Sequence, residues 1–227
     1  MTNRIIYIVF MLASANSYSQ KTNTAISLEA WHLEKLGLVD ITNLDSTILV
    51  SLMYATKDNF IGDSMYKTLR EAYLQPEAAK KLVKANQYLK EENAEYKLIV
   101  LDATRPQWAQ EIMWNKVKDT YMKKYVASPG RVSMHSYGVA VDLTILDKNN
   151  NELDMGTPVD FLEPLAEPRY ESEFLASGKL NSQQIKNREL LRRIMKKAGF
   201  RGIPNEWWHF EALTRDEAQL KYKPINW

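Results

Sequence analysis

The chain has 227 residues, of which 45 % are hydrophobic, and its 30 Lys and Arg nearly balance 28 Asp and Glu. This composition predicts one globular domain, and a net charge of +2 without a basic run argues against nucleic acid or an anionic membrane surface as a partner. The sequence contains no cysteine, which excludes disulfides, thiolate metal ligands and thiol nucleophiles.

The N-terminus has the three parts of a secretory signal. Arg4 supplies a positive charge, residues 5–12 are apolar, and small residues follow as far as Ser19. The apolar run is too short for a bilayer, which needs about 20 apolar residues. We therefore predict a signal at residues 1–19 and a mature domain at residues 20–227, exported to the periplasm or beyond the cell without stable membrane insertion. The sequence gives no indication of an oligomeric state.

Two strands and a helix are predicted in the first half of the mature chain. Residues 47–54 and residues 97–101 are apolar runs typical of strands. Between them, Pro76 begins a helix, because proline is favoured in a first helical turn. The apolar residues of this helix recur on one face, which indicates that the helix packs against the core.

The middle of the chain contains the clearest strand. Pro106 begins a helix that we expect to run to about residue 121. In residues 138–146, Val and Leu or Ile alternate with other residues, which is typical of a strand. A loop-rich region is expected over residues 147–178.

The last third is predicted to hold one more helix and one more strand. Asn181 caps the helix with Gln184 at the capping-box position, and Gly199 ends it. Residues 207–213 read as a final core strand. Because the helices and strands do not follow a βαβ repeat, the sequence predicts the α+β class.

His135 and Asp142 are the first pair of residues that indicate chemistry. Both are good zinc ligands. Seven fully extended residues would reach roughly 23 Å, so the chain must fold back between them, and Gly138 supplies a permissive position. A lone Asp among Val and Leu is costly without a partner, and a metal ion provides one.

Glu206 and His209 form the second pair. Residues three apart on a strand point to opposite faces, so Glu206 must lie on the turn after Pro204 to meet His209. With His135 and Asp142, His209 would complete a set of three ligands and leave one position for water, as in catalytic zinc sites. Glu206 would take the proton from that water.

Each of these residues also has an ordinary structural interpretation. A single His beside aromatic residues is more often a hydrogen-bonded core residue, but the chain has only three histidines, so their joint pattern favours a metal site. His32 lies apart from the pattern and reads as structural or surface. Arg105 follows a buried strand, and its guanidinium suits either the stabilisation of an oxyanion or a structural ion pair.

The spacing of these residues resembles that of a known family. Ser133-x-His135-x-x-Gly138-x-Ala140-x-Asp142, followed by Glu206-x-x-His209, is similar to the zinc D-alanyl-D-alanine peptidases. The longer pattern is closer to the D-alanyl-D-alanine dipeptidases, which include the vancomycin-resistance dipeptidase. Its supporting blocks extend over roughly residues 45 to 213 and are residues 54–62, Arg105-Pro106, residues 155–161 and residues 206–211.

The resemblance implies a single compact α+β domain with a central antiparallel sheet flanked by helices. It implies that His135, Asp142 and His209 bind one Zn²⁺ per chain, and that Glu206 is the general base. The implied activity is zinc-dependent hydrolysis of D-alanyl-D-alanine dipeptides to free D-alanine.

The resemblance also implies how a dipeptide is held. Arg105 would stabilise the tetrahedral intermediate, Asp160 would bind the free amino group, and Ser133 would help to hold the carboxylate end. The chain departs from the pattern at Ala103-Thr104, where a Gly-Tyr-like pair is expected before the arginine. This departure affects the shape of the substrate pocket and leaves the zinc ligands unchanged.

Three alternatives stay open at this stage. The first is a D,D- or L,D-carboxypeptidase of the same superfamily that acts on peptidoglycan stem peptides and needs an open cleft. The second is a zinc-bearing binding module without catalysis, against which Glu206 and Arg105 argue. The third is an envelope protein without a metal, in which the motifs are coincidental.

Overall fold

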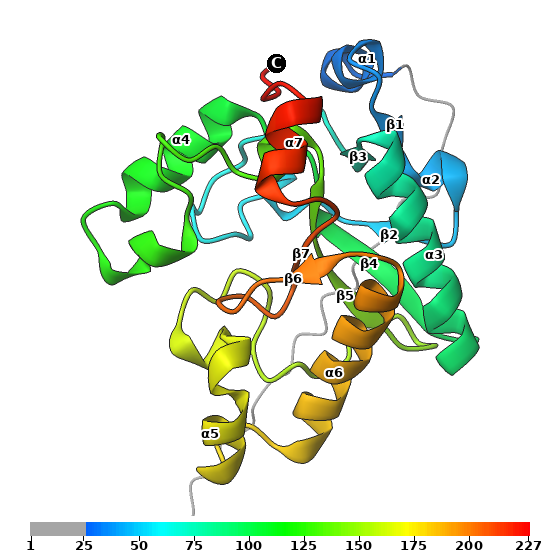
Figure 1. The fold of residues 1–227 in the computed structure, drawn as a ribbon, viewed down its shortest axis with the longest axis vertical. Coiled ribbons are helices and arrows are strands. Elements are labelled where there is room, and N and C mark those ends of the chain that lie inside the picture. Colours follow the sequence, from blue (N-terminus) through cyan, green and yellow to red (C-terminus); the bar gives the residue numbers. More distant parts are fainter. Residues whose placement is uncertain (1–25) are drawn as a thin grey trace, which may run out of the picture.

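The computed structural model describes residues 26–227, so the predicted signal at residues 1–19 lies outside the described residues. Its helices surround a central five-stranded sheet (Figure 1). In spatial order, the strands are β2 (Leu49–Val50), β4 (Lys97–Asp102), β5 (Ala140–Leu146), β7 (His209–Glu211) and β6 (Arg201–Gly202).

The prediction of one α+β domain is confirmed, and the sheet is antiparallel except at one edge. There β2 runs parallel to β4, because the chain between them crosses over through a long connection that includes helix α3 (Pro76–Glu92). The other neighbouring strands are all antiparallel. A second, two-stranded antiparallel sheet joins β1 (Val39–Asp40) and β3 (Tyr73–Leu74).

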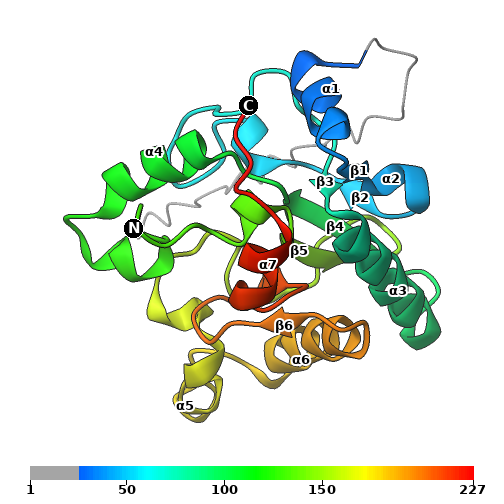
Figure 2. The ribbon, with the colours of Figure 1, turned by 45° about the horizontal axis from the view of Figure 1, so that its top comes forward.

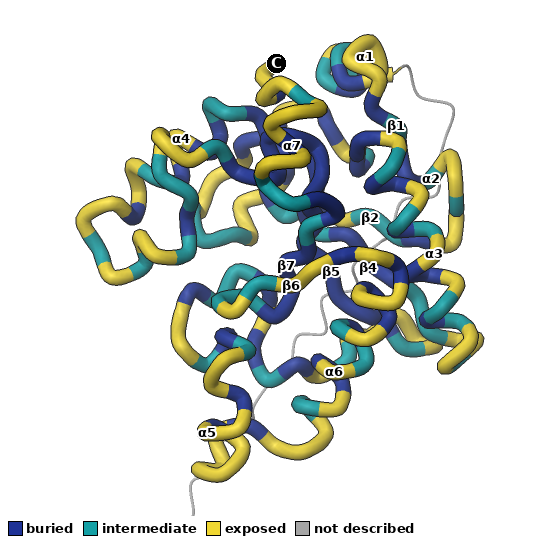
Figure 3. The backbone as a smooth tube through the Cα atoms, in the orientation of Figure 1, coloured by how far each residue is buried: buried dark blue, intermediate teal, exposed yellow. Residues whose placement is uncertain are grey.

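Strand β5 lies at the centre of the sheet and is buried along its whole length (Figure 3). It begins at Ala140 rather than at residue 138, because Gly138 has a φ of +71° and turns the chain before the strand starts. In the register of the sheet, Asp142 of β5 lies opposite Asp102 of β4 on one side and His209 of β7 on the other. A polar row therefore crosses three adjacent strands of an otherwise apolar sheet.

Two long helices lie side by side over the sheet, and shorter ones surround it. Helix α3 contacts α6 (Ser182–Lys197) and β4, and α4 (Gln107–Val117) lies on the far side of the sheet from α3 in both views (Figures 1 and 2). The remaining helices of the described residues are α1 (Leu28–Lys35), α2 (Ile41–Leu44), α5 (Glu171–Ala176) and α7 (Arg215–Lys221). Short 3₁₀ turns occur at Met53–Ala55, Tyr121–Tyr125, His135–Tyr137, Pro164–Ala166 and Pro168–Tyr170.

The boundaries predicted for α3 and α6 are confirmed, whereas the helix predicted from Pro106 to about residue 121 begins at Gln107 and ends at Val117. Pro76 is the first residue of α3. The Asn181 side chain accepts hydrogen bonds at the start of α6, and Gln184 completes the capping box. Gly199 follows the end of α6 with a φ of +91°, a conformation that glycine adopts readily.

The predicted strand over residues 47–54 is mostly wrong. Only Leu49–Val50 pairs with β4, and the chain then forms the 3₁₀ turn Met53–Ala55. The turn directs the buried Tyr54 side chain toward the candidate site, where it bonds to Asp160. The final strand is also shorter than predicted, since β7 covers only His209–Glu211, and Trp207 and Trp208 pack edge to face before it.

No helix among residues 26–227 has the length and apolar character that crossing a membrane requires.

Candidate metal and substrate site

The two predicted clusters meet at the polar row of the sheet. His135 opens a 3₁₀ turn, and Gly138 in the left-handed region then reverses the chain into β5, which carries Asp142. A side chain at position 138 would bring its Cβ within 3.1 Å of Thr104 Oγ1, so both the φ and the space favour glycine. His209 reaches the same point from β7, opposite Asp142.

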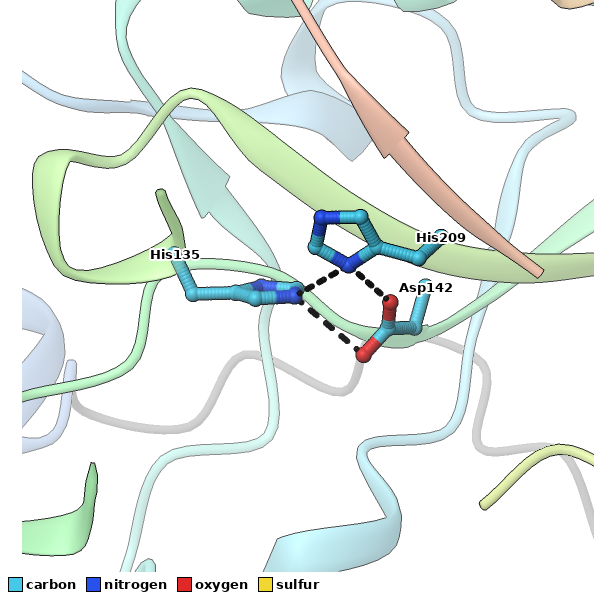
Figure 4. Close-up of side chains that lie close together, drawn as sticks. All are labelled: His135, Asp142 and His209. Carbon is cyan, nitrogen blue, oxygen red and sulfur yellow. Dashed lines mark hydrogen bonds and ion pairs between the residues drawn. The ribbon is translucent and has the colours of Figure 1, made fainter. Parts of the chain in front are cut away.

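The three side chains point toward one another with the spacing of metal ligands (Figure 4). His135 Nε2 lies 3.1 Å from His209 Nδ1 and 3.3 Å from Asp142 Oδ2, and His209 Nδ1 lies 2.9 Å from Asp142 Oδ1. Two atoms bound to a tetrahedral zinc at about 2.1 Å are about 3.4 Å apart. The donor set and its spacing therefore fit a tetrahedral metal ion with three protein ligands.

The opposite nitrogen of each histidine faces an acceptor. His135 Nδ1 donates to the backbone carbonyl of Ala103 at 2.7 Å, which leaves Nε2 as the free lone pair. His209 Nε2 lies 3.7 Å from Glu211 Oε1. Acceptors in these positions orient metal-binding imidazoles and increase their basicity.

The electrostatics favour a cation at this position. Burial raises the pKa of Asp142, but His135 and His209 outweigh it and hold this pKa well below its ordinary value. Burial lowers the pKa of His209, yet Asp142 and Glu211 overcome this effect and raise it to about 10. Without a metal, His209 therefore holds a proton where a metal would bind.

Arg105 lies beside this cluster as part of a buried ion pair. Its Nε and Nη2 donate to Asp102 Oδ2 at 2.8 and 2.6 Å, and Nη1 donates to Gln110 Oε1 at 3.0 Å. Its Nη2 lies 3.5 Å from Asp142 Oδ2. Asp102 is fully buried and also accepts a hydrogen bond from Tyr66 at 2.9 Å. Arg105 therefore forms the structural ion pair that was one of its two predicted roles. This ion pair fixes the guanidinium at the wall of a cavity described below.

Glu206 directly follows the bend at Pro204 and Asn205, before β7 begins. Its Oε2 is 3.9 Å from His209 Nδ1. Burial raises the pKa of the Glu206 carboxyl to about 8, despite the opposing effect of His209. A carboxyl group with this pKa, next to the three candidate ligands, suits proton transfer near neutral pH.

Asp160 lies in the same cavity with Tyr54, which the sequence analysis did not single out. The Tyr54 hydroxyl donates to Asp160 Oδ2 at 2.6 Å across 106 residues of sequence. Burial raises the pKa of Asp160 to about 7, although the Tyr54 hydrogen bond opposes the increase. The backbone of Asp160 is left-handed, with a φ of +64°.

The cavity that joins these residues has a volume of about 530 Å³. Its lining comes from α4 and the segment that follows it on one side, and from the loops at residues 160–162 and 203–206 on the other. Ser133 lines this cavity, and its Oγ accepts a hydrogen bond from the His135 amide at 3.3 Å. All seven predicted site residues border the same space.

Arg215 also lines the cavity and was not predicted. Its Nη1 donates to the Val132 carbonyl at 2.5 Å, next to Ser133, and its Nε is buried without a hydrogen-bond partner. Asp102 and Tyr54 were missed as well. Asp102 precedes Arg105 by three residues at a strand end, which is a weak signal for the ion pair, whereas nothing in the sequence brings Tyr54 next to Asp160.

Comparisons with known proteins agree on one family. A family model described as D-ala-D-ala dipeptidase matches residues 34–223. The chain is 34 % identical over 174 residues to the D-alanyl-D-alanine dipeptidase of Escherichia coli (strain K12), covering 77 % of this chain and 83 % of that protein. It is 33 % identical over 185 residues to the D-alanyl-D-alanine dipeptidase of Enterococcus faecium, covering 72 % of this chain and 84 % of that protein. A solved structure of the LdcB LD-carboxypeptidase has a TM-score of 0.41 at 20 % identity, covering 69 % of this chain and 67 % of that one, a likeness too low to bear on function.

Proposed function

The chain belongs to the D-Ala-D-Ala dipeptidase family of metallopeptidases, and from this membership we propose that it hydrolyses D-alanyl-D-alanine to free D-alanine with one bound zinc ion. The observation that carries the proposal is the buried cluster of His135, Asp142 and His209 beside Glu206. Three ligands of this type leave a fourth position open, which distinguishes catalytic zinc sites from structural ones.

Glu206 is proposed as the general base. When bound, zinc supplies a Lewis acid that lowers the pKa of water at the site to about 7. Glu206 accepts a proton as water attacks the peptide carbonyl, and then donates it to the leaving amine. The pKa of about 8 that burial gives this carboxyl group suits both transfers.

Arg105 is proposed to stabilise the negative charge that develops on the carbonyl oxygen. Its bonds to Asp102 and Gln110 fix the guanidinium before substrate arrives, so no reorganisation is needed during the reaction. The 3.5 Å separation between Arg105 and Asp142 keeps this positive group close to the proposed zinc ligands.

Asp160 and Ser133 are proposed to hold the two ends of the dipeptide. The carboxylate of Asp160 binds the free ammonium group, and Ser133 with the neighbouring Arg215 faces the carboxylate end. An acidic anchor for a free amino group has no use in an enzyme that trims a long stem peptide, because such a substrate has no free amino group next to the scissile bond. Asp160 therefore favours the dipeptidase over the carboxypeptidase alternative.

Export is proposed as well, from the signal pattern at residues 1–19. Fractionation of cells that produce the full chain tests this proposal. Recovery of a shortened protein outside the cytoplasm supports export, and recovery of the intact N-terminus in the cytoplasm contradicts it.

The activity is tested with the purified protein (residues 20–227) on D-Ala-D-Ala, L-Ala-L-Ala and a stem pentapeptide, with and without a chelator. We expect release of D-alanine from D-Ala-D-Ala alone, its loss with the chelator, and its recovery on addition of Zn²⁺. Cleavage of the pentapeptide in place of the dipeptide would transfer the proposal to a carboxypeptidase. Zinc binding without hydrolysis of any substrate would indicate a binding module.

A further inference from the structure

Asp160 has a left-handed backbone conformation, which is unfavourable for most residues other than glycine. Asp160 and Asn150 are the two non-glycine residues among residues 26–227 that have a positive φ. Residues in this region persist only where the surrounding structure fixes them. Asp160 follows no regular element, since helix and strand are absent between the end of β5 at Leu146 and the turn at Pro164, apart from one isolated bridge at Glu152. Its conformation therefore depends on contacts made by the rest of the loop.

Arg188 of α6 forms hydrogen bonds to the backbone of this loop. It is only 1 % exposed, although arginine is rarely buried to this extent. Its Nε donates to the Met155 carbonyl at 2.7 Å, and its Nη2 donates to the Leu165 carbonyl at 3.1 Å. These carbonyls lie five residues before and five residues after Asp160. The Arg188 guanidinium is thus hydrogen-bonded to the chain on both sides of Asp160.

A second contact joins this loop to Glu206. Trp207 follows Glu206 in the chain, and its Nε1 donates to Thr157 Oγ1 at 2.8 Å. The Arg188 guanidinium carbon lies 5.8 Å from the centre of the Trp207 ring, and its Nη2 lies 3.5 Å from the same Thr157 oxygen. Arg188 therefore contacts both the loop that carries Asp160 and the residue that follows Glu206.

Arg188 forms a long ion pair with a carboxylate that a second arginine shares, so this pair compensates its buried charge only in part. Its closest carboxylate, that of Glu171, is 3.5 Å away. The same carboxylate accepts two hydrogen bonds at 2.8 Å from Arg192, which is half-buried on the next turn of α6. A buried cation is costly, and here its short hydrogen bonds go to backbone carbonyls of the Asp160 loop.

We infer that Arg188 is a positioning residue that sets substrate recognition: it holds the Asp160 carboxylate where the substrate's ammonium group binds. The inference rests on the proposed function, and it concerns selectivity for a free amino group rather than hydrolysis itself. The metal ligands belong to the turn at His135 and to β5 and β7, none of which Arg188 contacts by a hydrogen bond.

The test compares two substrates that differ only in the amino group: D-Ala-D-Ala and propionyl-D-alanine. In Arg188→Lys and Arg188→Met we expect kcat/KM for D-Ala-D-Ala to fall about 10- to 100-fold, mostly through KM, because misplacement by about 1 Å has effects of this size. The value for propionyl-D-alanine should change less than about 3-fold, since this substrate makes no bond to Asp160. Lysine keeps the charge and should lose less than methionine.

Arg192→Met is the matched control. This substitution removes a neighbouring arginine, which is also the closer partner of Glu171, and leaves the Asp160 loop unchanged. The kcat/KM values for both substrates should therefore equal those of the wild type. Bound zinc per chain, measured for every variant, should equal that of the wild type.

Gly156→Ala provides an independent variant if the Arg188 variants do not fold. Gly156 has a φ of +81°, and an added Cβ would lie 2.4 Å from Leu180 Cδ2, so the substitution displaces the same loop without uncovering a buried charge. It should give the same loss of selectivity. Equal losses for both substrates, or unchanged selectivity in all loop variants, would overturn the role of Arg188. A wild type that hydrolyses neither substrate would instead refute the proposed function.

Discussion

Asp142 and His209 lie directly opposite each other on β5 and β7, with Asp142 Oδ1 2.9 Å from His209 Nδ1. Two of the three candidate ligands are therefore fixed relative to each other by the hydrogen bonds of an antiparallel strand pair. This pairing determines which side of the sheet the site occupies, because a register shift of one residue would turn Asp142 to the opposite face.

Replacement of Asp142 by Asn should abolish tight metal binding. The amide has nearly the same size but carries no negative charge, so the affinity for Zn²⁺ should fall by about 100-fold or more, and with it the activity at limiting zinc. Competition with a zinc-binding dye measures the affinity. The matched control is Asp154→Asn, which lies outside the cavity and should bind zinc as the wild type does. Unchanged affinity in Asp142→Asn would remove Asp142 from the ligand set.

Glu206→Gln should separate catalysis from metal binding. Loss of the proposed general base is expected to lower kcat by about 100- to 10,000-fold. Zinc content should not change, because Glu206 lies 3.9 Å from His209 Nδ1 and is not one of the three clustered ligands. Steady-state kinetics and elemental analysis on the same preparation check both parts. A variant that loses its zinc would mean that Glu206 is a ligand.

Metal uptake by the zinc-free protein should release at least one proton per chain at pH 7.5, from His209 and in part from water bound to the zinc. The pKa of His209 is raised to about 10 by Asp142 and Glu211, so its imidazole is protonated at this pH until zinc replaces the proton. Because proton and metal compete, the apparent affinity should increase with pH up to this value. Calorimetry in buffers with different ionisation enthalpies counts the proton. A result near zero would show that His209 is already neutral.

Tyr54→Phe should shift the acidic limb of the pH profile. The Tyr54 hydroxyl stabilises the ionised form of Asp160, so its removal should raise the pKa of Asp160 above its value of about 7. Only the ionised form binds an ammonium group, and kcat/KM for D-Ala-D-Ala should therefore fall near neutral pH and recover at higher pH. Propionyl-D-alanine, which has no ammonium group, should keep the wild-type profile. An unshifted limb would contradict this role of Tyr54.

Gly138→Ala should be destabilising and should also weaken zinc binding. The φ of +71° costs an alanine roughly 1 to 2 kcal/mol, and the new Cβ would lie 3.1 Å from Leu38 and Thr104. Because the turn at Gly138 places His135 next to β5, relaxation of this strain would move a ligand. Thermal unfolding with and without zinc measures both effects. Gly130→Ala is the control, since its Cβ would meet nothing within 4 Å.

Local signals in the sequence predicted much of the fold and the core of the site. The capping residues of α6 and the alternation in β5 depend on neighbouring residues only, and both predictions are confirmed. The need for a turn between His135 and Asp142 followed from chain length alone, and Gly138 provides it.

Contacts between distant segments could not be predicted in the same way. Tyr54 and Asp160 are 106 residues apart, and no periodicity or spacing joins them. Arg188 is one of several basic residues on a helix whose opposite face is charged and solvated, so its burial depends on how α6 packs against a loop without regular structure. The strand predicted at residues 47–54 failed at its C-terminal end, where the apolar pattern favours extension but the chain turns at Met53–Ala55 and Tyr54 contacts the distant Asp160.

The proposed metal ligands and the proposed substrate-binding residue are held in place by different parts of the fold. Asp142 and His209 are held by a sheet, whereas Asp160 is held by a loop fastened to a helix. If these residues have the proposed roles, changes in the loop should alter which amino-terminal group the enzyme accepts and leave the proposed metal site intact. This separation makes residues 155–165 the natural segment to exchange or randomise when the enzyme is to be retargeted, and it offers evolution a route to new peptide substrates without rebuilding the metal centre.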